Sequence, residues 1–203
     1  MPASGGIPIL VVVSGPSGVG KDTLIDRLRD LDHALDCHFV VTATTRAPRS
    51  GEQEGVNHHF VDRREFERMI ENNELLEWAS VYGNYYGVPR SQVRVALNAG
   101  KHVLLRVDVQ GAARLRLVAP EAVFVFVMPP SLESLRTRLK LRGKDSAESI
   151  ATRLAAAEDE IARGKTFDYR VVNRDGGLDD AARELVDIIH RESTRIPPRA
   201  VSV

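Results

Sequence analysis

Features that would place this chain in a specialised class of protein are scarce among its 203 residues. A single cysteine, Cys37, excludes an internal disulfide and is typical of a reducing compartment. The 28 basic residues (Lys and Arg) balance the 28 acidic ones, so no overall field attracts nucleic acid or an anionic membrane. We therefore expect neither as a partner.

Long hydrophobic runs are missing as well. The apolar run Ile7–Val13 is too short to cross a bilayer, and the N-terminal residues lack the basic start and apolar stretch of a secretory signal. Hydrophobic residues make up 43% and charged residues 28% of the chain, close to the average of globular proteins. We expect a cytoplasmic protein with one domain over residues 1–203, and no pattern predicts its oligomeric state.

Strand-like and helix-like segments alternate along most of the chain. Apolar, β-branched runs of the kind found in parallel strands covered on both faces occur at Ile9–Val13, His102–Asp108, Ala122–Met128 and Tyr169–Asn173. Helical periodicity lies between them at Ala112–Val118, Leu132–Leu141 and Ala181–Ile189. This alternation predicts an α/β fold, an open parallel sheet with helices on both faces.

Two stretches interrupt this rhythm. Residues 42–88 are more polar and richer in Gly and aromatics, which predicts an inserted subdomain with its own strands. Residues 135–165 are charged and contain arginines, which predicts a helical excursion. The core is then expected to comprise 7–41, 89–134 and 166–193. The tail 194–203 contains two prolines and little periodicity, so we expect it to be loose.

The stretch SGPSGVGKDTL, at Ser14–Leu24, has the spacing of a phosphate-binding loop. Its glycines let backbone N–H groups turn inward, the following helix adds its dipole, and Lys21 reaches the outer phosphates of a nucleotide. A buried-type strand before the loop and an amphipathic helix after it supply the expected context. The predicted ATP-binding residues here are Gly15, Pro16, Ser17, Gly18, Val19, Gly20, Lys21, Asp22 and Thr23.

Asp22 departs from that pattern, which has Ser or Thr at this position to hold a metal ion. A carboxylate beside the phosphates repels them unless Mg²⁺ lies between, whereas the helix dipole favours an acid in the first turn. We expect Asp22 at the helix N-terminus and no direct protein ligand to Mg²⁺. Magnesium keeps much of its water shell in such sites, and Thr23 and Asp108 are the candidates for contact through water.

A second group of polar residues lies in the inserted stretch. Arg46 and Arg49 flank Pro48, and two guanidinium groups in a constrained turn suit bidentate capture of a phosphate, although isolated surface arginines are commonly only solvated. The carboxylate of Glu77 can accept parallel hydrogen bonds from the N1–H and amino group of guanine, a donor pair that adenine lacks. Trp78, beside it, is expected in the core.

The chain closely resembles the guanylate kinase family in the order and spacing of its motifs. These are SGPSGVGK, TATTRAPRSGE, NELLEWASVYGNYYG, LLRVDVQGA, PPSLESLRTRLKLRG, IATRLAAAEDE and FDYRVVN. The resemblance implies a P-loop nucleoside-monophosphate-kinase fold with a parallel-sheet core, a GMP-binding insertion and a helical lid. It also implies transfer of the ATP γ-phosphoryl group to GMP, and to dGMP, with Mg²⁺ as cofactor.

The resemblance also assigns roles to individual residues. The GMP-binding set is Thr42, Arg46, Arg49, His58, Glu77, Tyr86 and Asp108. The catalytic set is Lys21, Arg46, Arg138, Arg142 and Arg153, which would neutralise charge on the transferring group. Arg142 and Asn173 are further candidates on the ATP side.

Three positions depart from the family pattern. His58 stands where a tyrosine is usual, and an imidazole can donate the same hydrogen bond to the GMP phosphate. Val88 replaces a Ser or Thr that contacts guanine O6, so selectivity should rest more heavily on Glu77. Arg106 replaces a common acidic residue and lies one strand step from Asp108, which predicts either a pair that orients Asp108 or a structural ion pair.

Two other functions fit parts of the pattern. A phosphonate-pathway kinase that phosphorylates ribose 1,5-bisphosphate has a similar Lys-Asp loop and a similar YYGV stretch. Against it stand Glu77 and the intact TTRAPRSGE and DVQGA motifs, which fit a guanine nucleotide better. A non-catalytic guanylate-kinase-like interaction module usually has a degraded loop and lacks the phosphate-binding arginines, which are all present here.

Overall fold

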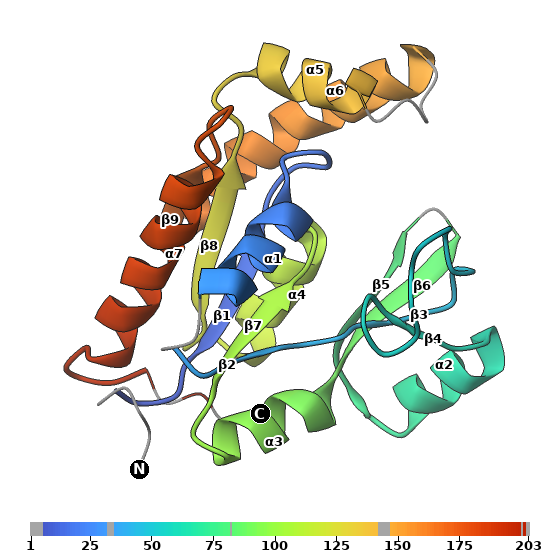
Figure 1. Ribbon diagram of the computed structural model, residues 1–203. Coiled ribbons are helices and arrows are strands. Elements are labelled where there is room, and N and C mark those ends of the chain that lie inside the picture. The colour runs from blue at the N-terminus through green and yellow to red at the C-terminus, as the bar shows by residue number, and fades with distance from the viewer. Residues whose placement is uncertain (1–5, 32–34, 82, 142–146, 200, 202–203) are drawn as a thin grey trace.

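The structure, a computed structural model, describes residues 6–31, 35–81, 83–141, 147–199 and 201 (Figure 1). The elements are β1 (Leu10–Ser14), α1 (Lys21–Leu31), β2 (Cys37–Phe39), β3 (Ala43–Thr44), β4 (His59–Phe60), α2 (Arg63–Glu71), β5 (Leu75–Val81), β6 (Asn84–Pro89), α3 (Arg90–Asn98), β7 (His102–Arg106), α4 (Val109–Val118), β8 (Val123–Met128), α5 (Leu132–Leu141), α6 (Ala147–Arg163), the 3₁₀ turn η1 (Gly164–Thr166), β9 (Tyr169–Val172) and α7 (Leu178–Ser193).

A five-stranded sheet forms the centre of the molecule. Its strand order is β2-β7-β1-β8-β9, and every neighbouring pair is parallel. The continuous apolar runs in the sequence form these strands because both faces of a parallel sheet are covered. The predicted α/β class with a parallel core is therefore confirmed.

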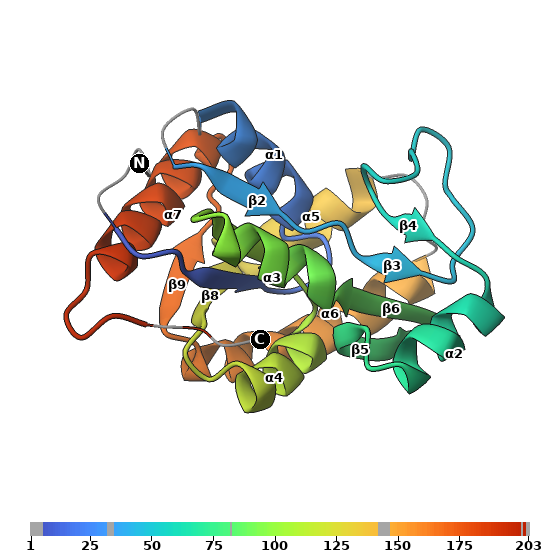
Figure 2. The same cartoon turned by 90° about the horizontal axis from the view of Figure 1, so that it is seen from below.

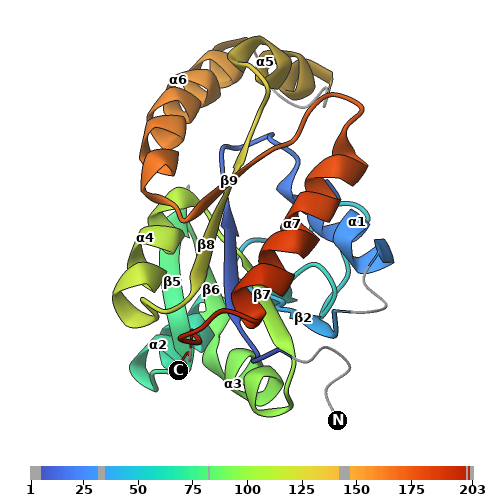
Figure 3. The same cartoon turned by 90° about the vertical axis from the view of Figure 1, so that its left-hand side faces the viewer.

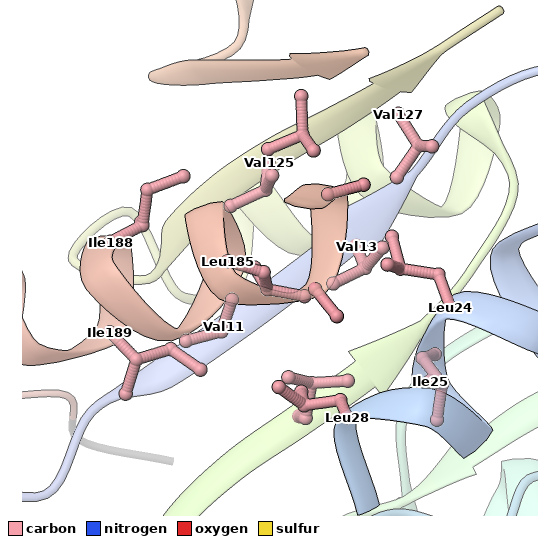
Figure 4. Close-up of a cluster of buried hydrophobic side chains, with 14 of the residues drawn as sticks. Val11, Val13, Leu24, Ile25, Leu28, Val125, Val127, Leu185, Ile188 and Ile189 are labelled. Carbon is pink, nitrogen blue, oxygen red and sulfur yellow. The ribbon is translucent and has the colours of Figure 1, made fainter. Parts of the chain in front are cut away.

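Alternate residues of β1 point to opposite faces of this sheet, as the strand period of two requires. Val11 and Val13 pack with side chains of α1 and α7, such as Leu28 and Leu185 (Figure 4). Leu10 and Val12 belong to the other cluster, beneath α3 and α4. Figure 3 shows the two helical layers on either side of the sheet.

A smaller four-stranded sheet, of order β4-β3-β6-β5, stands beside the core (Figure 2). Its strands run from Ala43 to Pro89, one residue beyond the 42–88 segment expected to be an insertion. Phe66 of α2 fills its small core with Ala43 and Leu75. A Cβ on Gly87 would lie 2.9 Å from both Phe66 and Leu75, so this strand passes too close to the helix for a side chain.

Helices α5 and α6 form the predicted helical excursion. They pack on each other through Leu135, Leu139 and Ala157, all buried. Across the described part of the chain, no helix has the length and apolar character needed to span a membrane.

Two expectations about individual segments are corrected. The tail is held at Arg199, whose Nε donates to Glu192 at 2.7 Å and whose Nη1 donates to the Ala122 carbonyl at 3.2 Å. This part of 194–203 is therefore not loose. Trp78 is 40% exposed and meets Tyr85 edge to face, because it lies on the outer face of β5 rather than in the core.

Candidate functional site

The predicted phosphate-binding loop joins β1 to α1. Gly15 and Gly20 both have positive φ values, of 149° and 95°. A Cβ at Gly15 would lie 2.4 Å from the Val127 carbonyl oxygen, so only glycine fits there. The Nζ atom of Lys21 donates to the carbonyl oxygens of Gly15 at 2.5 Å and Pro16 at 3.0 Å, which curls the side chain back along the loop.

Asp22 lies in the first turn of α1, as predicted, and is exposed. Its carboxylate accepts a hydrogen bond from Nη1 of Arg106, at the end of β7. Of the two roles expected for Arg106, the pairing with Asp108 is therefore replaced by an ion pair with Asp22. The parallel pairing of β1 with β7 explains this contact, because it brings the end of β7 beside the start of α1.

A cleft of about 450 Å³ lies between the phosphate loop and the smaller sheet. Lys21 and Asp22 line it on one side, together with Arg106. All seven residues assigned to GMP by resemblance line it too: Thr42, Arg46, Arg49, His58, Glu77, Tyr86 and Asp108. Segments that lie far apart in the sequence therefore converge on one cavity.

Glu52 organises the two arginines of the inserted segment. Its Oε1 accepts from Nη2 of Arg46 at 2.8 Å, and its Oε2 accepts from the backbone N–H of Arg49 at 2.7 Å. The hydrogen bond from Arg46 is the main cause that lowers the pKa of Glu52 to about 2. The Nε atom of Arg46 is buried and has no hydrogen-bond partner within the described residues.

His58 lies beside these arginines. Its Nδ1 is 2.8 Å from the Thr42 hydroxyl, and its ring meets Tyr86 edge to face at 6.1 Å between centroids. Burial lowers the pKa of His58, and the nearby positive charge of Arg46 lowers it further. Both influences favour the neutral form of the imidazole, and the charge of Glu52 opposes them.

The far end of the cleft contains Glu77, whose side chain is only 5% exposed. Arg114 of α4 donates through Nε to Glu77 Oε1 at 2.8 Å. Burial raises the pKa of Glu77; Arg114 lowers it, and the charge of Asp108 raises it. Asp108 itself caps α4, accepting the Gly111 N–H at 2.7 Å, and Val88 lies opposite Glu77 in the sheet.

The candidate ATP-side residues meet behind the phosphate loop. Arg138 of α5 donates to the carbonyl oxygens of Val19 at 2.9 Å and Asn173 at 2.7 Å. Its guanidinium also pairs with Asp175 at 2.7 Å. The Nδ2 atom of Asn173 donates to the same Val19 carbonyl at 2.9 Å, and Asn173 is buried.

Helix α6 carries the next residues that were considered for the lid. Arg153 lies on α6, is partly exposed and does not line the cavity. Glu160, also on α6, is near the loop: burial raises its pKa, whereas the charge of Lys21 and the backbone N–H of Ser17 lower it. The helix therefore passes over the phosphate loop. Arg142 lies outside the described residues.

Four residues around the site were missed by the sequence reasoning: Glu52, Arg114, Glu160 and Asp175. The TTRAPRSGE motif contains Glu52, and its spacing from both arginines is a signal that could have found it. The other three act on partners 37 or more residues away, such as Arg114 on Glu77, and no local pattern identifies such partners.

The chain is similar in sequence and in fold to known proteins. The model of the guanylate kinase family matches residues 8–192. The chain is 44% identical over 197 residues to guanylate kinase 2, chloroplastic/mitochondrial, of Oryza sativa subsp. japonica, covering 97% of this chain and 68% of that protein. It is 46% identical over 189 residues to guanylate kinase of Halalkalibacterium halodurans, covering 93% and 92%.

Among solved structures, guanylate kinase from Anaplasma phagocytophilum aligns with a TM-score of 0.77 and 35% identity. The alignment covers 94% of this chain and 88% of that one. Sequence and fold thus agree over nearly the whole length, and the chain belongs to the guanylate kinase family.

Proposed function

We propose that this protein is an ATP:GMP phosphotransferase that converts GMP, and dGMP, to the diphosphate. The observation that carries this proposal is the single cleft in which the loop lysine Lys21, the arginine pair Arg46 and Arg49 and the buried acid Glu77 are all present. These groups suit, in turn, the phosphates of ATP, the phosphate of GMP and the guanine base.

Guanine recognition is assigned to the Glu77 end of the cleft. An ionised carboxylate accepts two hydrogen bonds from the N1–H and amino groups of guanine, whereas adenine would leave the buried charge unpaired. Val88 offers no hydrogen bond to O6 from the opposite strand position. Asp108, which also lines the cleft, is assigned to the same nucleotide.

The GMP phosphate is assigned to the arginine end. Arg46 has a buried Nε donor without a partner in the described residues, and Glu52 holds its Nη2 on the other side. We assign Arg49, Tyr86, Thr42 and His58 to the same phosphate region. In the tautomer that accepts from the Thr42 hydroxyl at Nδ1, neutral His58 carries its hydrogen on Nε2 and can donate to an anion.

The reaction requires little covalent chemistry from the protein. The GMP phosphate is already ionised, so its oxygen attacks the γ-phosphorus of ATP in line without a strong general base. Lys21 and Arg46 position the two substrates and neutralise charge. We assign the same role to the lid arginines Arg138, Arg142 and Arg153 when the lid closes over the loop.

Magnesium is the cofactor that such a reaction uses, and the side chains present fit it through water. The described residues contain no cluster of three or more His, Cys, Asp or Glu able to hold a metal ion. Asp108 provides carboxylate oxygen in the cleft, and Thr23 is exposed on the first turn of α1. Asp108 and Thr23 would hold Mg²⁺ through its water shell, and the ion would supply positive charge that neutralises the ATP phosphates.

Two alternative functions are less well supported. A ribose 1,5-bisphosphate kinase has no use for a buried carboxylate that reads a base. An interaction module has no need of the glycine-lysine loop and the organised arginines. We further propose cytoplasmic localisation, with ATP and GMP as partners and no nucleic acid.

A coupled assay of ADP release tests the proposal. The purified chain is incubated with ATP and Mg²⁺ and offered GMP, dGMP, AMP or ribose 1,5-bisphosphate in turn. Strong turnover of GMP and weak turnover of AMP is the expected result. A preference for the bisphosphate, or no turnover of GMP, would overturn the assignment.

A further inference from the structure

Arg114 is the cation that touches the base-reading carboxylate. Its Nε and Nη2 atoms both lie 2.8 Å from Oε1 of Glu77. Arg114 does not line the cleft, so it approaches Glu77 from the side of α4 while Glu77 faces the cavity. Any effect of Arg114 on the substrate must therefore act through Glu77.

The other groups that face Glu77 do not replace Arg114. Val88, directly opposite on β6, is apolar. Asp108, at the N-terminus of α4, adds a second negative charge near Glu77. Among the described residues, Arg114 is the group that stabilises the ionised form of this buried carboxylate.

The protonation state of Glu77 decides which purine edge it matches. An ionised carboxylate presents two acceptors, which fit the N1–H and amino donors of guanine. A neutral carboxyl presents one donor and one acceptor, which fit N1 and the N6 amino group of adenine. Without a hydroxyl at position 88, discrimination between the purines rests more heavily on Glu77.

We propose that Arg114 is a positioning residue for purine selectivity, which holds Oε1 of Glu77 in place and keeps the carboxylate in the form that reads guanine. This inference rests on the proposed function and extends it to a residue outside the substrate cavity.

The electrostatics of the pocket support the proposal. Burial is the largest influence on the pKa of Glu77 and raises it, and Asp108 raises it too. Arg114 acts in the opposite direction, through its hydrogen bond and its charge. When Arg114 is replaced by a neutral residue, both raising influences remain and the pKa rises further, so Glu77 becomes protonated at higher pH.

The test compares kcat/KM for GMP and for AMP in the wild type and in Arg114→Met, from about pH 5 to about pH 9. We expect the GMP/AMP ratio to fall about 10-fold to 100-fold in Arg114→Met near neutral pH, mostly through KM for GMP, and to recover partly as pH rises. Arg114→Lys, which keeps the charge, should retain most of the selectivity.

Two further variants isolate the pathway through Glu77. Glu77→Gln presents one donor and one acceptor at every pH, so its low GMP/AMP ratio should not depend on pH. The double variant Glu77→Gln with Arg114→Met should show no further loss, because Arg114 then has no carboxylate to hold. Arg94→Met removes an exposed arginine of α3 and should leave the ratio unchanged.

Calorimetric binding of GMP at each pH provides a readout that is independent of turnover. An unchanged, pH-independent ratio in folded Arg114→Met, with a normal wild type, would overturn the inference alone. An additive loss in the double variant would do the same. If Arg114→Met does not fold, Arg114→Gln serves the same comparison. A wild type that does not turn over GMP would instead overturn the proposed function.

Discussion

At the scale of single residues, the arrangement of Arg46 and Arg49 depends on Glu52. One oxygen of its carboxylate holds the Arg46 side chain and the other holds the backbone of Arg49. In the proposed function, Glu52 contributes to phosphate binding by fixing the positions of these two cations.

Replacing Glu52 by Gln should raise KM for GMP about tenfold and leave KM for ATP unchanged, because a lost charge-assisted hydrogen bond weakens the orientation of Arg46. Steady-state kinetics with each substrate varied in turn measure both constants. Glu65→Gln is the matched control, since Glu65 pairs with Arg68 on the exposed face of α2. Equal effects of the two substitutions would contradict this role.

The same ion pair predicts a dependence of stability on pH. The pKa of Glu52 is lowered from 4.5 to about 2 in the folded protein, so the pair stabilises the fold above pH 4.5 and this contribution is lost as pH falls towards 2. Urea unfolding of the wild type and of Glu52→Gln, near pH 7 and again at successively lower pH, measures it. The difference in free energy of unfolding should shrink on acidification; a constant difference would refute the prediction.

In the proposed function Lys21 contributes charge to the reaction. Its amino group donates to the carbonyl oxygens of Gly15 and Pro16 in its own loop, so its removal should cost the fold little. Lys21→Ala should reduce kcat on the order of 10³-fold or more, with an unchanged circular dichroism spectrum and melting temperature. Near-normal production of GDP by this variant would argue against the proposed function.

The residues of the site differ in how far sequence could predict them. Glu77, Arg46 and Arg49 were predicted from the chemistry of their side chains and from family motifs, and all three line the cleft. The contact of Arg106 with Asp22 was not predicted. The sequence suggested Asp108, one strand step away, because neighbours along a strand are visible in sequence whereas a partner 84 residues away is not.

At the scale of elements, the large sheet could be predicted well. Each core strand is a continuous apolar run, and such runs are distinctive when both faces are buried. The two-residue strands β3 and β4 are not predictable in this way, because they exist through pairing with β6 and with each other. Sequence indicated an inserted subdomain with strands, but not their order.

The contact between α1 and β7 makes a prediction about nucleotide binding. Arg106 offsets the negative charge of Asp22 beside the phosphate loop, so Arg106→Ala should weaken ADP binding about tenfold when Mg²⁺ is absent. The double variant Asp22→Ser with Arg106→Ala should regain most of this affinity. Titration of a fluorescent ADP analogue, with and without Mg²⁺, measures these constants; no recovery in the double variant would exclude charge compensation.

At the scale of the whole molecule, the cleft lies where the two sheets meet. The large sheet has cores on both faces. The smaller sheet packs around Phe66 on one side, and its Leu76 and Val88 belong to the core of the large sheet beneath α3 and α4. The sequence predicted this division, but its geometry arises from packing between residues far apart in the chain.

The position of β1 has a consequence for hydrogen exchange. Its residues are fully buried and it pairs with β7 on one side and β8 on the other. Amide protons of β1 should therefore exchange with deuterium only when the entire core unfolds, whereas those of β3 and β4 should exchange through smaller local openings. One deuterium-labelling experiment thus reports two free energies: that of global unfolding, from β1, and that of local opening of the smaller sheet, from β3 and β4.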